Sequence, residues 1–129
     1  MEDKLYIMII DDENIVGKRL KPALEKRGDI VETFVDSRKA LERFDEKNFD
    51  IVITDIRMDD IDGLEVLEHV RSHSKQTKVI MITGYATVEV ARQALAKGAF
   101  DFIAKPFKPN DLRTIIEKAA KQLRTEQAS

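Results

Sequence analysis

The sequence predicts an α/β fold, in which a five-stranded parallel sheet is doubly wound with helices on both faces. Short apolar runs rich in Ile and Val recur along the chain without strict alternation, as in strands that are buried on both faces. These runs cover residues 6–10, 30–34, 51–54, 79–83 and 102–104. A stretch with helical spacing of apolar residues follows each run, and this repeated alternation of strand and helix is typical of a doubly wound sheet.

Each of the five helices is predicted from one apolar stripe. In chain order the stripes are Val16/Leu20/Ala23/Leu24, Ala40/Leu41/Phe44, Gly63/Val66/Leu67/Val70, Val88/Ala91/Ala94/Leu95 and Leu112/Ile115/Ile116/Ala119/Leu123. Gly28 and Gly98 follow the first and fourth stripes, at the position where glycine commonly ends a helix. Asp36 precedes the second as a capping residue, and Pro109 opens the fifth. These signals fix the expected helix boundaries.

Length and composition indicate one soluble globular domain. The chain has 129 residues, of which 43% are hydrophobic and 36% charged. We expect a domain over residues 1–124, with 125–129 as a tail or the start of a linker.

The net charge of −2 argues against nucleic-acid or membrane binding, and the absence of cysteine excludes disulfides and thiol chemistry. No apolar run approaches the roughly 20 residues of a membrane helix, so a cytoplasmic location is expected.

Charged and polar side chains follow the predicted strands at the edge where open parallel sheets bind ligands. They are Asp11, Asp12 and Glu13 after the first run, Asp55 after the third, Thr83 at the end of the fourth and Lys105 after the fifth. Because the carboxyl ends of parallel strands meet at one edge, we expect these side chains to lie close together. The edge therefore combines several carboxylates with a hydroxyl and an ammonium group.

The charges at this edge predict a divalent cation. Asp11, Asp12 and Asp55 carry −3 when ionised and Lys105 carries +1, which leaves −2. Two carboxylates about 4 Å apart repel by roughly 4 kcal/mol at an effective dielectric constant of about 20. An all-oxygen site favours Mg²⁺, with Mn²⁺ as an alternative. Such a metal also binds phosphate oxygens, so Asp55 is a candidate nucleophile that forms an aspartyl phosphate.

Four motifs resemble the receiver domain of two-component response regulators. They are IIDDE (9–13), TDIRMDDIDG (54–63), MITGYA (81–86) and AKPF (104–107), in the order and spacing of that family. The resemblance covers residues 5–123 and is strongest to receivers of nitrogen-regulation-type transcription activators. It implies the flavodoxin-like fold with strand order 2-1-3-4-5, which the chemotaxis member of the family has.

The resemblance also implies a role for each matching residue of the site. Asp55 is the expected phosphoryl acceptor. Asp12, Asp55 and the main-chain carbonyl of Arg57 are the expected Mg²⁺ ligands, while Asp11 holds the metal mainly through water. Lys105 is expected to form an ion pair with the phosphoryl group.

Further positions match the residues with which members of the family convert phosphorylation into a conformational change. Thr83 is expected to hydrogen-bond the phosphoryl group and to move together with Phe102, which makes these two residues the switch. Pro106 is expected to follow a cis peptide bond. Arg57 and Tyr85 stand where the family tunes attack by water, so they are expected to set the lifetime of the phosphate.

The function implied by the resemblance is a signalling switch rather than an enzyme. A sensor histidine kinase or a phosphotransfer protein would supply the phosphoryl group from a phosphohistidine, and slow autodephosphorylation would remove it. Phosphorylation would shift the face made by the fourth helix, fifth strand and fifth helix, which would control an output, expected to be transcription. The same face could form a homodimer. No direct contact of this domain with nucleic acid or membrane is expected.

Three alternatives remain open at this point. A Mg²⁺-dependent phosphatase of the haloacid dehalogenase type also uses an aspartate nucleophile, but that nucleophile follows the first strand and a second Asp stands two places later, where this chain has Glu13. A flavodoxin-like electron carrier would need a phosphate loop where this chain has acidic residues. A pseudo-receiver that binds partners without being phosphorylated is the third.

The sequence also departs from the family at Asp59, where proline is usual.

Two other patterns resemble metal sites. MDDIDG suggests a calcium loop, but with Gly63 in sixth place the first and twelfth positions are Met58 and His69, which is wrong for an EF-hand. His69 and His73 stand four residues apart on one predicted helix, as in two-histidine metal sites. The sequence indicates no third ligand, so both histidines are expected to be exposed helix residues.

Overall fold

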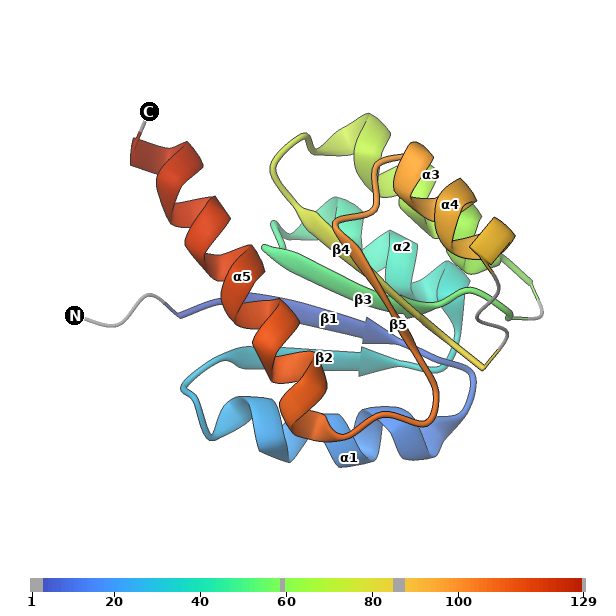
Figure 1. Ribbon diagram of the computed structural model, residues 1–129, viewed down its shortest axis with the longest axis horizontal. Helices are drawn as coiled ribbons and strands as arrows, with labels where there is room; N and C mark the ends of the chain where they lie inside the picture. Colours follow the sequence, from blue (N-terminus) through green and yellow to red (C-terminus); the bar gives the residue numbers. More distant parts are fainter. Residues whose placement is uncertain (1–3, 59, 85–87, 129) are drawn as a thin grey trace.

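The computed structural model describes residues 4–58, 60–84 and 88–128, in which strands and helices alternate throughout (Figure 1). The five strands are β1 (Tyr6–Ile10), β2 (Ile30–Phe34), β3 (Ile51–Asp55), β4 (Lys78–Thr83) and β5 (Asp101–Ala104). The five helices are α1 (Asn14–Glu25), α2 (Ser37–Glu46), α3 (Gly63–His73), α4 (Val88–Ala96) and α5 (Pro109–Ala128). This order confirms the predicted α/β class.

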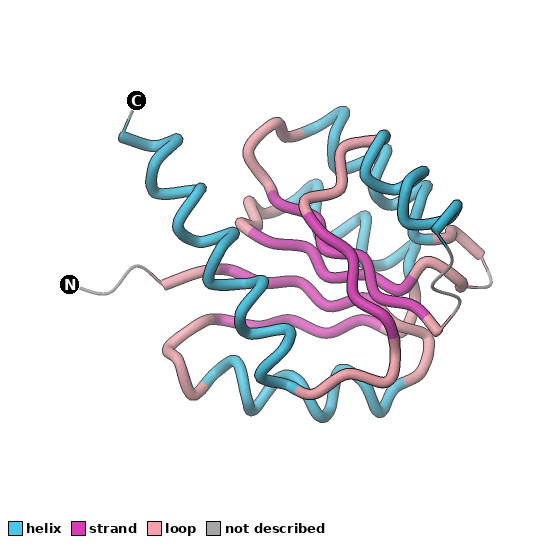
Figure 2. The backbone as a smooth tube through the Cα atoms, viewed as in Figure 1, coloured by secondary structure: helices cyan, strands magenta, loops and turns pink. Residues whose placement is uncertain are grey.

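The strands form one parallel sheet in the order β2-β1-β3-β4-β5. Ile53 of β3 pairs with Ile9 of β1 on one side and with Ile80 of β4 on the other. Figure 2 shows the sheet as a central layer between helices. The order 2-1-3-4-5, which the resemblance implied, is therefore confirmed, and β1 and β3 lie side by side with their carboxyl ends at the same edge.

Each face of the sheet carries its own hydrophobic core, because neighbouring residues of a strand point to opposite faces. Ile7 and Ile9 of β1 belong to the core covered by α1 and α5, whereas Met8 and Ile10 belong to the core covered by α2, α3 and α4. Figure 1 shows the same division of the helices. Burial on both faces explains why the strands are continuous apolar runs.

Local signals at the helix ends act as the sequence predicts. The side chain of Asp36 accepts hydrogen bonds from the main-chain N–H groups of Arg38 and Lys39 at 2.9 and 3.3 Å, which caps α2. Gly28 and Gly98 have φ angles of 95° and 104°, in the left-handed region that favours glycine. Both glycines stand just beyond the ends of their helices.

Three strand boundaries differ from the prediction by one residue. β3 extends to Asp55, β4 begins at Lys78 and β5 begins at Asp101. The added residues are charged, so an apolar pattern could not include them. Lys78 is nevertheless buried, and its Nζ donates a hydrogen bond to Glu126 Oε2 at 2.8 Å.

Helix α5 continues past residue 124 and includes the partner of Lys78. The division of the chain into 1–124 and 125–129 stays a prediction. Over the described residues, no helix combines the length and the apolar character that crossing a membrane requires.

Candidate phosphoryl-acceptor site

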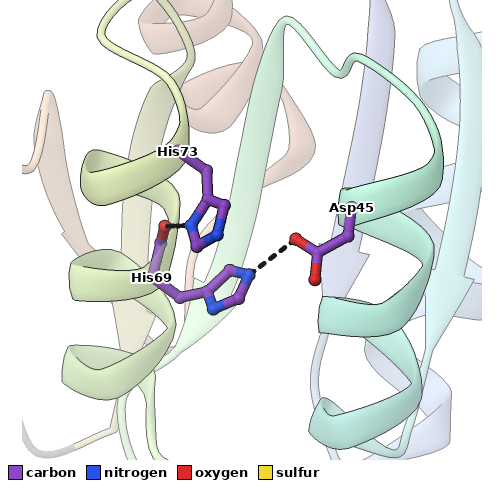
Figure 3. A group of neighbouring side chains, drawn as sticks. All are labelled: Asp45, His69 and His73. Atoms are coloured by element: carbon purple, nitrogen blue, oxygen red, sulfur yellow. Dashed lines mark hydrogen bonds and ion pairs between the residues drawn. The ribbon is translucent and has the colours of Figure 1, made fainter.

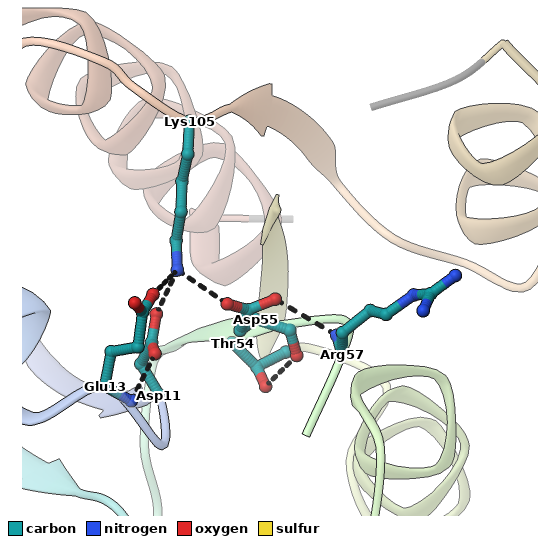
Figure 4. A network of polar contacts seen from close by, with 6 residues as sticks. All are labelled: Asp11, Glu13, Thr54, Asp55, Arg57 and Lys105. Atoms are coloured by element: carbon teal, nitrogen blue, oxygen red, sulfur yellow. Dashed lines mark hydrogen bonds and ion pairs between the residues drawn. The ribbon is translucent and has the colours of Figure 1, made fainter. Parts of the chain in front are cut away.

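Three strands bring an aspartate pair and a lysine together at the carboxyl edge of the sheet (Figure 4). Asp55 is the last residue of β3, Asp11 follows β1 and Lys105 follows β5. Lys105 Nζ lies 2.6 Å from Asp55 Oδ2 and 2.8 Å from Asp11 Oδ2. Both aspartates are buried, so the predicted meeting of these residues occurs in a partly desolvated site.

The Asp55 carboxylate is oriented from two sides. Its Oδ2 accepts a hydrogen bond from Lys105, and its Oδ1 accepts one from the main-chain N–H of Arg57 at 3.0 Å. The hydroxyl of Thr54 donates to the main-chain oxygen of Asp55 at 2.9 Å. The main-chain N–H of Ile56 donates to the main-chain oxygen of Ile82 at 3.1 Å, which keeps the end of β3 attached to β4. The sheet therefore fixes the backbone that carries Asp55.

Lys105 also contacts a third carboxylate, that of Glu13, at 2.9 Å. Burial alone lowers the pKa of Lys105, but its close contacts with the carboxylates of Asp11, Asp55 and Glu13 outweigh burial and raise the pKa well above the ordinary value. Lys105 is therefore positively charged at neutral pH. Burial raises the pKa of Asp11, against the opposing effect of Lys105 and of the hydrogen bond from the main-chain N–H of Glu13.

The carboxylates of Asp11, Glu13 and Asp55 can offer a cation one oxygen each, with these oxygens within 4.8 Å of one another. Together they carry −3 when ionised, and Lys105 reduces this charge to −2. Asp11 Oδ2 is buried and accepts no well-aligned hydrogen bond from the described residues, although Lys105 lies close to it. A hard divalent cation fits this donor set, because all the ligands are oxygen and the excess charge matches.

Glu13 is the member of the cluster that the sequence-based assignment left out. The predicted third carboxylate was Asp12, whose side chain is exposed at the start of the turn after β1. Glu13 stands next to it, so the acidic run after the first strand was the available signal. The role of Asp12 as a metal ligand stays a prediction.

The remaining predicted residues lie around this edge. Thr83 is fully buried at the end of β4, one position beyond Ile82, the residue paired with Asp55. Phe102 of β5 is partly buried and packs on the core covered by α2, α3 and α4. The peptide bond between Lys105 and Pro106 is cis, as the resemblance implies. Tyr85 lies outside the described residues, and its predicted role stays a prediction.

The acidic loop after β3 has two residues that the family resemblance leaves unexplained, Asp59 and Asp60. The carboxylate of Asp60 accepts two hydrogen bonds from Arg38 of α2, at 3.0 and 3.1 Å. The side chain of Asp62 caps α3 through the main-chain N–H of Glu65, at 2.9 Å. Asp60 and Asp62 are therefore structural. Asp59, at the position where the family usually has proline, is outside the described residues.

Comparison with known proteins identifies the family to which this fold belongs. Regulatory protein AtoC of Escherichia coli (strain K12) is 41% identical over 113 residues, which are 88% of this chain and 24% of AtoC. The chain thus spans about a quarter of the length of that relative. A CheY-like response regulator receiver domain from Methanospirillum hungatei JF-1 superposes with a TM-score of 0.91 at 31% identity, over 96% of this chain and 99% of the other.

A second solved structure is the beryllofluoride-activated NtrC4 receiver domain dimer. Its TM-score is 0.87 at 30% identity, over 92% of this chain and 98% of the other. The family model for the response regulator receiver domain matches residues 7–117, which include both Asp11 and Lys105. This range contains the whole site and reaches into every strand. The chain is a receiver domain of the two-component response regulator family, related to those of nitrogen-regulation-type transcription regulators.

Proposed function

We propose that Asp55 accepts a phosphoryl group from a phosphohistidine of a sensor histidine kinase or phosphotransfer protein, and that the modified domain controls transcription through an attached output. One observation carries the assignment of the acceptor. The Asp55 carboxylate lies 2.6 Å from Lys105 Nζ, and its neighbours Asp11 and Glu13 complete a set of oxygens that fits a cation. A buried carboxylate with this surrounding charge suits phosphoryl transfer.

In the transfer, a carboxylate oxygen of Asp55 attacks phosphorus. The new O–P bond forms as the P–N bond to the donor imidazole breaks, and the imidazole leaves with the electron pair of that bond. The acidic residues at this edge would hold Mg²⁺, which would supply positive charge to the phosphoryl oxygens. Lys105 already lies where it can pair with a phosphoryl oxygen on Asp55, because it contacts Oδ2. The hydrogen bond from the Arg57 N–H holds the other carboxylate oxygen in place.

The output of the switch is the face made by α4, β5 and α5. A phosphoryl group adds nearly two negative charges and further acceptor oxygens, which favour inward movement of the Thr83 hydroxyl. Phe102 would then occupy the space that Thr83 leaves, and the population of the domain would shift to the active conformation. Val88 and Leu95 of α4 are exposed apolar side chains. They support this face as the contact surface of a homodimer, since the activated NtrC4 receiver domain is itself a dimer in solution.

Slow autodephosphorylation removes the phosphoryl group: water attacks phosphorus, the O–P bond to Asp55 breaks, and inorganic phosphate leaves while Asp55 regains its carboxylate. The exposed Arg57 lies two residues beyond Asp55 and would limit or direct the approach of that water. The rate of this hydrolysis therefore sets how long the active conformation lasts. An Arg57→Ala variant would change the rate of phosphate loss.

Intact-mass measurement after incubation with Mg²⁺ and acetyl phosphate tests the acceptor. One phosphoryl adduct is expected in the parent chain and none in Asp55→Asn. Asp60→Asn is the matched control, because it removes a carboxylate from the same loop that is paired with Arg38 and not with Lys105. This control should keep the adduct.

Two results would overturn the proposal. An adduct that persists in Asp55→Asn would place the phosphoryl group on another residue. The second result is a parent chain without an adduct, although Mg²⁺ binds and a quenched time course rules out rapid hydrolysis. That result would make the domain a pseudo-receiver that binds its partners without phosphorylation.

A further inference from the structure

Three metal-ligating side chains meet between α2 and α3, away from the phosphoryl site (Figure 3). They are Asp45, His69 and His73, each with one ligand atom within 4.8 Å of the others. His69 Nε2 lies 2.8 Å from Asp45 Oδ1, and the two imidazole rings are stacked with centroids 4.2 Å apart. We propose that these residues form a second metal site, which binds a divalent transition metal of the Zn²⁺ class and joins α2 to α3.

His73 already has the orientation of a ligand. Its Nδ1 lies 2.8 Å from the main-chain oxygen of His69. A carbonyl oxygen only accepts hydrogen bonds, so Nδ1 is the donor in this contact, and in the neutral ring this tautomer places the lone pair on Nε2. Metal-bound histidines commonly have this arrangement, in which a main-chain carbonyl fixes the ring and its tautomer. Figure 3 shows the other ring nitrogen of His73 on the side of His69 and Asp45.

His69 and Asp45 form the other half of the site. The ring and the carboxylate share a hydrogen bond at 2.8 Å. The neutral imidazole of His69 can instead carry its N–H proton on Nδ1. In that tautomer Nε2 can bind a metal, and the ring does not have to be deprotonated. Ligand atoms of a tetrahedral Zn²⁺ site lie about 3.3 Å apart, given metal–ligand distances of about 2.0–2.1 Å. Small side-chain rotations are therefore enough to admit the ion.

The ligands stand on packed elements rather than on loops. Helix α3 is anchored by Val66, Leu67 and Val70, which are fully buried. The ring of Phe44 from α2 meets His69 edge-on, with centroids 6.2 Å apart, and limits the rotation of the imidazole. The i, i+4 spacing of the two histidines places both on one side of α3. Preorganisation of this kind favours metal binding, because few rotamers have to be restricted.

The electrostatic surroundings and the donor set select the ion. Asp45 is in the last turn of α2 and His73 is the last residue of α3, so the negative ends of both helix dipoles are near the ion. Two nitrogens and one oxygen suit Zn²⁺, Co²⁺ or Ni²⁺ and disfavour Mg²⁺. A cavity of about 420 Å³, lined in part by Asp45 and His73, adjoins the site. It leaves room for water in the fourth coordination position.

This site is separate from the phosphoryl acceptor. In a parallel sheet each helix returns the chain from the carboxyl edge to the opposite edge. The ends of α2 and α3 therefore lie at the edge remote from Asp55. The sequence predicted His69 and His73 as exposed residues without a third ligand, because Asp45 is 24 residues away from His69 along the chain.

Zn²⁺ titration of the tag-free chain at neutral pH, with Mg²⁺ in excess to occupy the acidic site, tests the proposal. The chain has only these two histidines, so imidazole ¹⁵N resonances report this site alone. The expected result is one Zn²⁺ per chain with both imidazoles shifted. His73→Gln should weaken binding at least about 100-fold, since loss of an outer-shell partner alone costs 10–100-fold. Circular dichroism would verify that this variant is folded.

Matched variants separate the two sites. Asp45→Asn should weaken Zn²⁺ binding, whereas Glu46→Gln, which removes the neighbouring charge from α2, should leave the affinity unchanged. Asp55→Asn should also leave it unchanged. The proposal is overturned if the imidazole resonances do not respond to Zn²⁺, if folded His73→Gln binds as tightly as the parent, or if Asp55→Asn abolishes binding.

Discussion

Gly63 packs directly against the main chain of Asp55: a Cβ atom added at Gly63 would lie 2.3 Å from the Asp55 carbonyl oxygen and 2.6 Å from the Cα of Ile56. The main-chain N–H of Gly63 also donates to the carbonyl oxygen of Ile56 at 2.8 Å. The first residue of α3 thus supports the backbone that carries the proposed phosphoryl acceptor, and any larger residue there must displace that backbone.

Gly63→Ala should therefore destabilise the domain and reduce phosphorylation together. The clash is with backbone atoms, which cannot rotate away, so a loss of about 1–3 kcal/mol or more in the free energy of unfolding is expected. Urea unfolding and the acetyl phosphate assay measure the two effects. Gly84→Ala is the stability control, because none of the described residues has an atom within 4 Å of its added Cβ, its chain neighbours aside. Equal unfolding midpoints for the two variants would contradict the account of Gly63.

Substitution of single carboxylates distinguishes the ligands of Mg²⁺. The resemblance predicts Asp12, whereas the cluster of carboxylate oxygens contains Glu13. The Glu13 side chain is 64% exposed and is paired with Lys105, so it has to leave that partner to reach an ion. Asp12→Asn should weaken Mg²⁺ binding by about tenfold or more, which is about 1.4 kcal/mol, and Glu13→Gln should weaken it less.

Calorimetric titration of Mg²⁺ into the two variants measures this difference. Asp60→Asn is the control, because Asp60 is paired with Arg38 and its substitution leaves the cluster intact. The opposite order of affinities would show that Glu13 replaces Asp12 as the ligand in this chain.

The ion pair between α2 and β2 predicts a dependence of stability on pH. Arg43 donates two hydrogen bonds to the carboxylate of Glu32, at 2.8 and 2.9 Å, and these bonds lower the pKa of Glu32 in the folded protein. A lowered pKa means that the folded state prefers the ionised form. The stabilisation is therefore complete above the ordinary value of 4.5 and is lost as the pH falls through the lowered value.

Glu32→Gln should lower the urea midpoint at neutral pH, and its difference from the parent should disappear in strong acid. The pair is partly exposed, so the effect should be small and should decrease with added salt. A difference that stays constant from neutral pH to strong acid would mean that the side chain stabilises the domain by packing rather than by charge.

Truncation after residue 124 tests the predicted end of the domain. The cut removes Glu126, which pairs with the buried Lys78 at 2.8 Å, and leaves a buried ammonium group without that partner. The truncated chain should melt lower than the 129-residue chain, by roughly 2–5 °C. In the background of Lys78→Met the same truncation should have a smaller effect. Equal melting temperatures for the 129-residue and truncated chains would place the folded boundary at 124.

Much of the fold could be predicted because burial on both faces turns strands into apolar runs. Residues 6–10 and 30–34 match β1 and β2, and Asp36 and Gly98 mark helix ends as expected. These signals are local. The strand order came from the resemblance, since apolar runs alone do not specify which strands are neighbours.

The contacts that the sequence did not reveal join residues far apart in the chain. Lys105 and Glu13 are 92 positions apart, Lys78 and Glu126 are 48 apart, and Asp45 and His69 are 24 apart. Periodicity reports only which side of its own element a residue occupies. Long, charged side chains can reach several neighbours, so their partners depend on the folded arrangement.

The two cores leave the sheet unequally supported across its width. β3 and β4 are buried along their whole length, whereas no residue of β5 is fully buried. The middle of the sheet is therefore held by packing on both faces, and the strand that leads into Lys105 has less of this support. A change at Asp55, at the end of the buried strand β3, would therefore displace β5 more easily than β3 or β4. Because β5 lies at the edge of the sheet, a partner molecule could contact the part that moves.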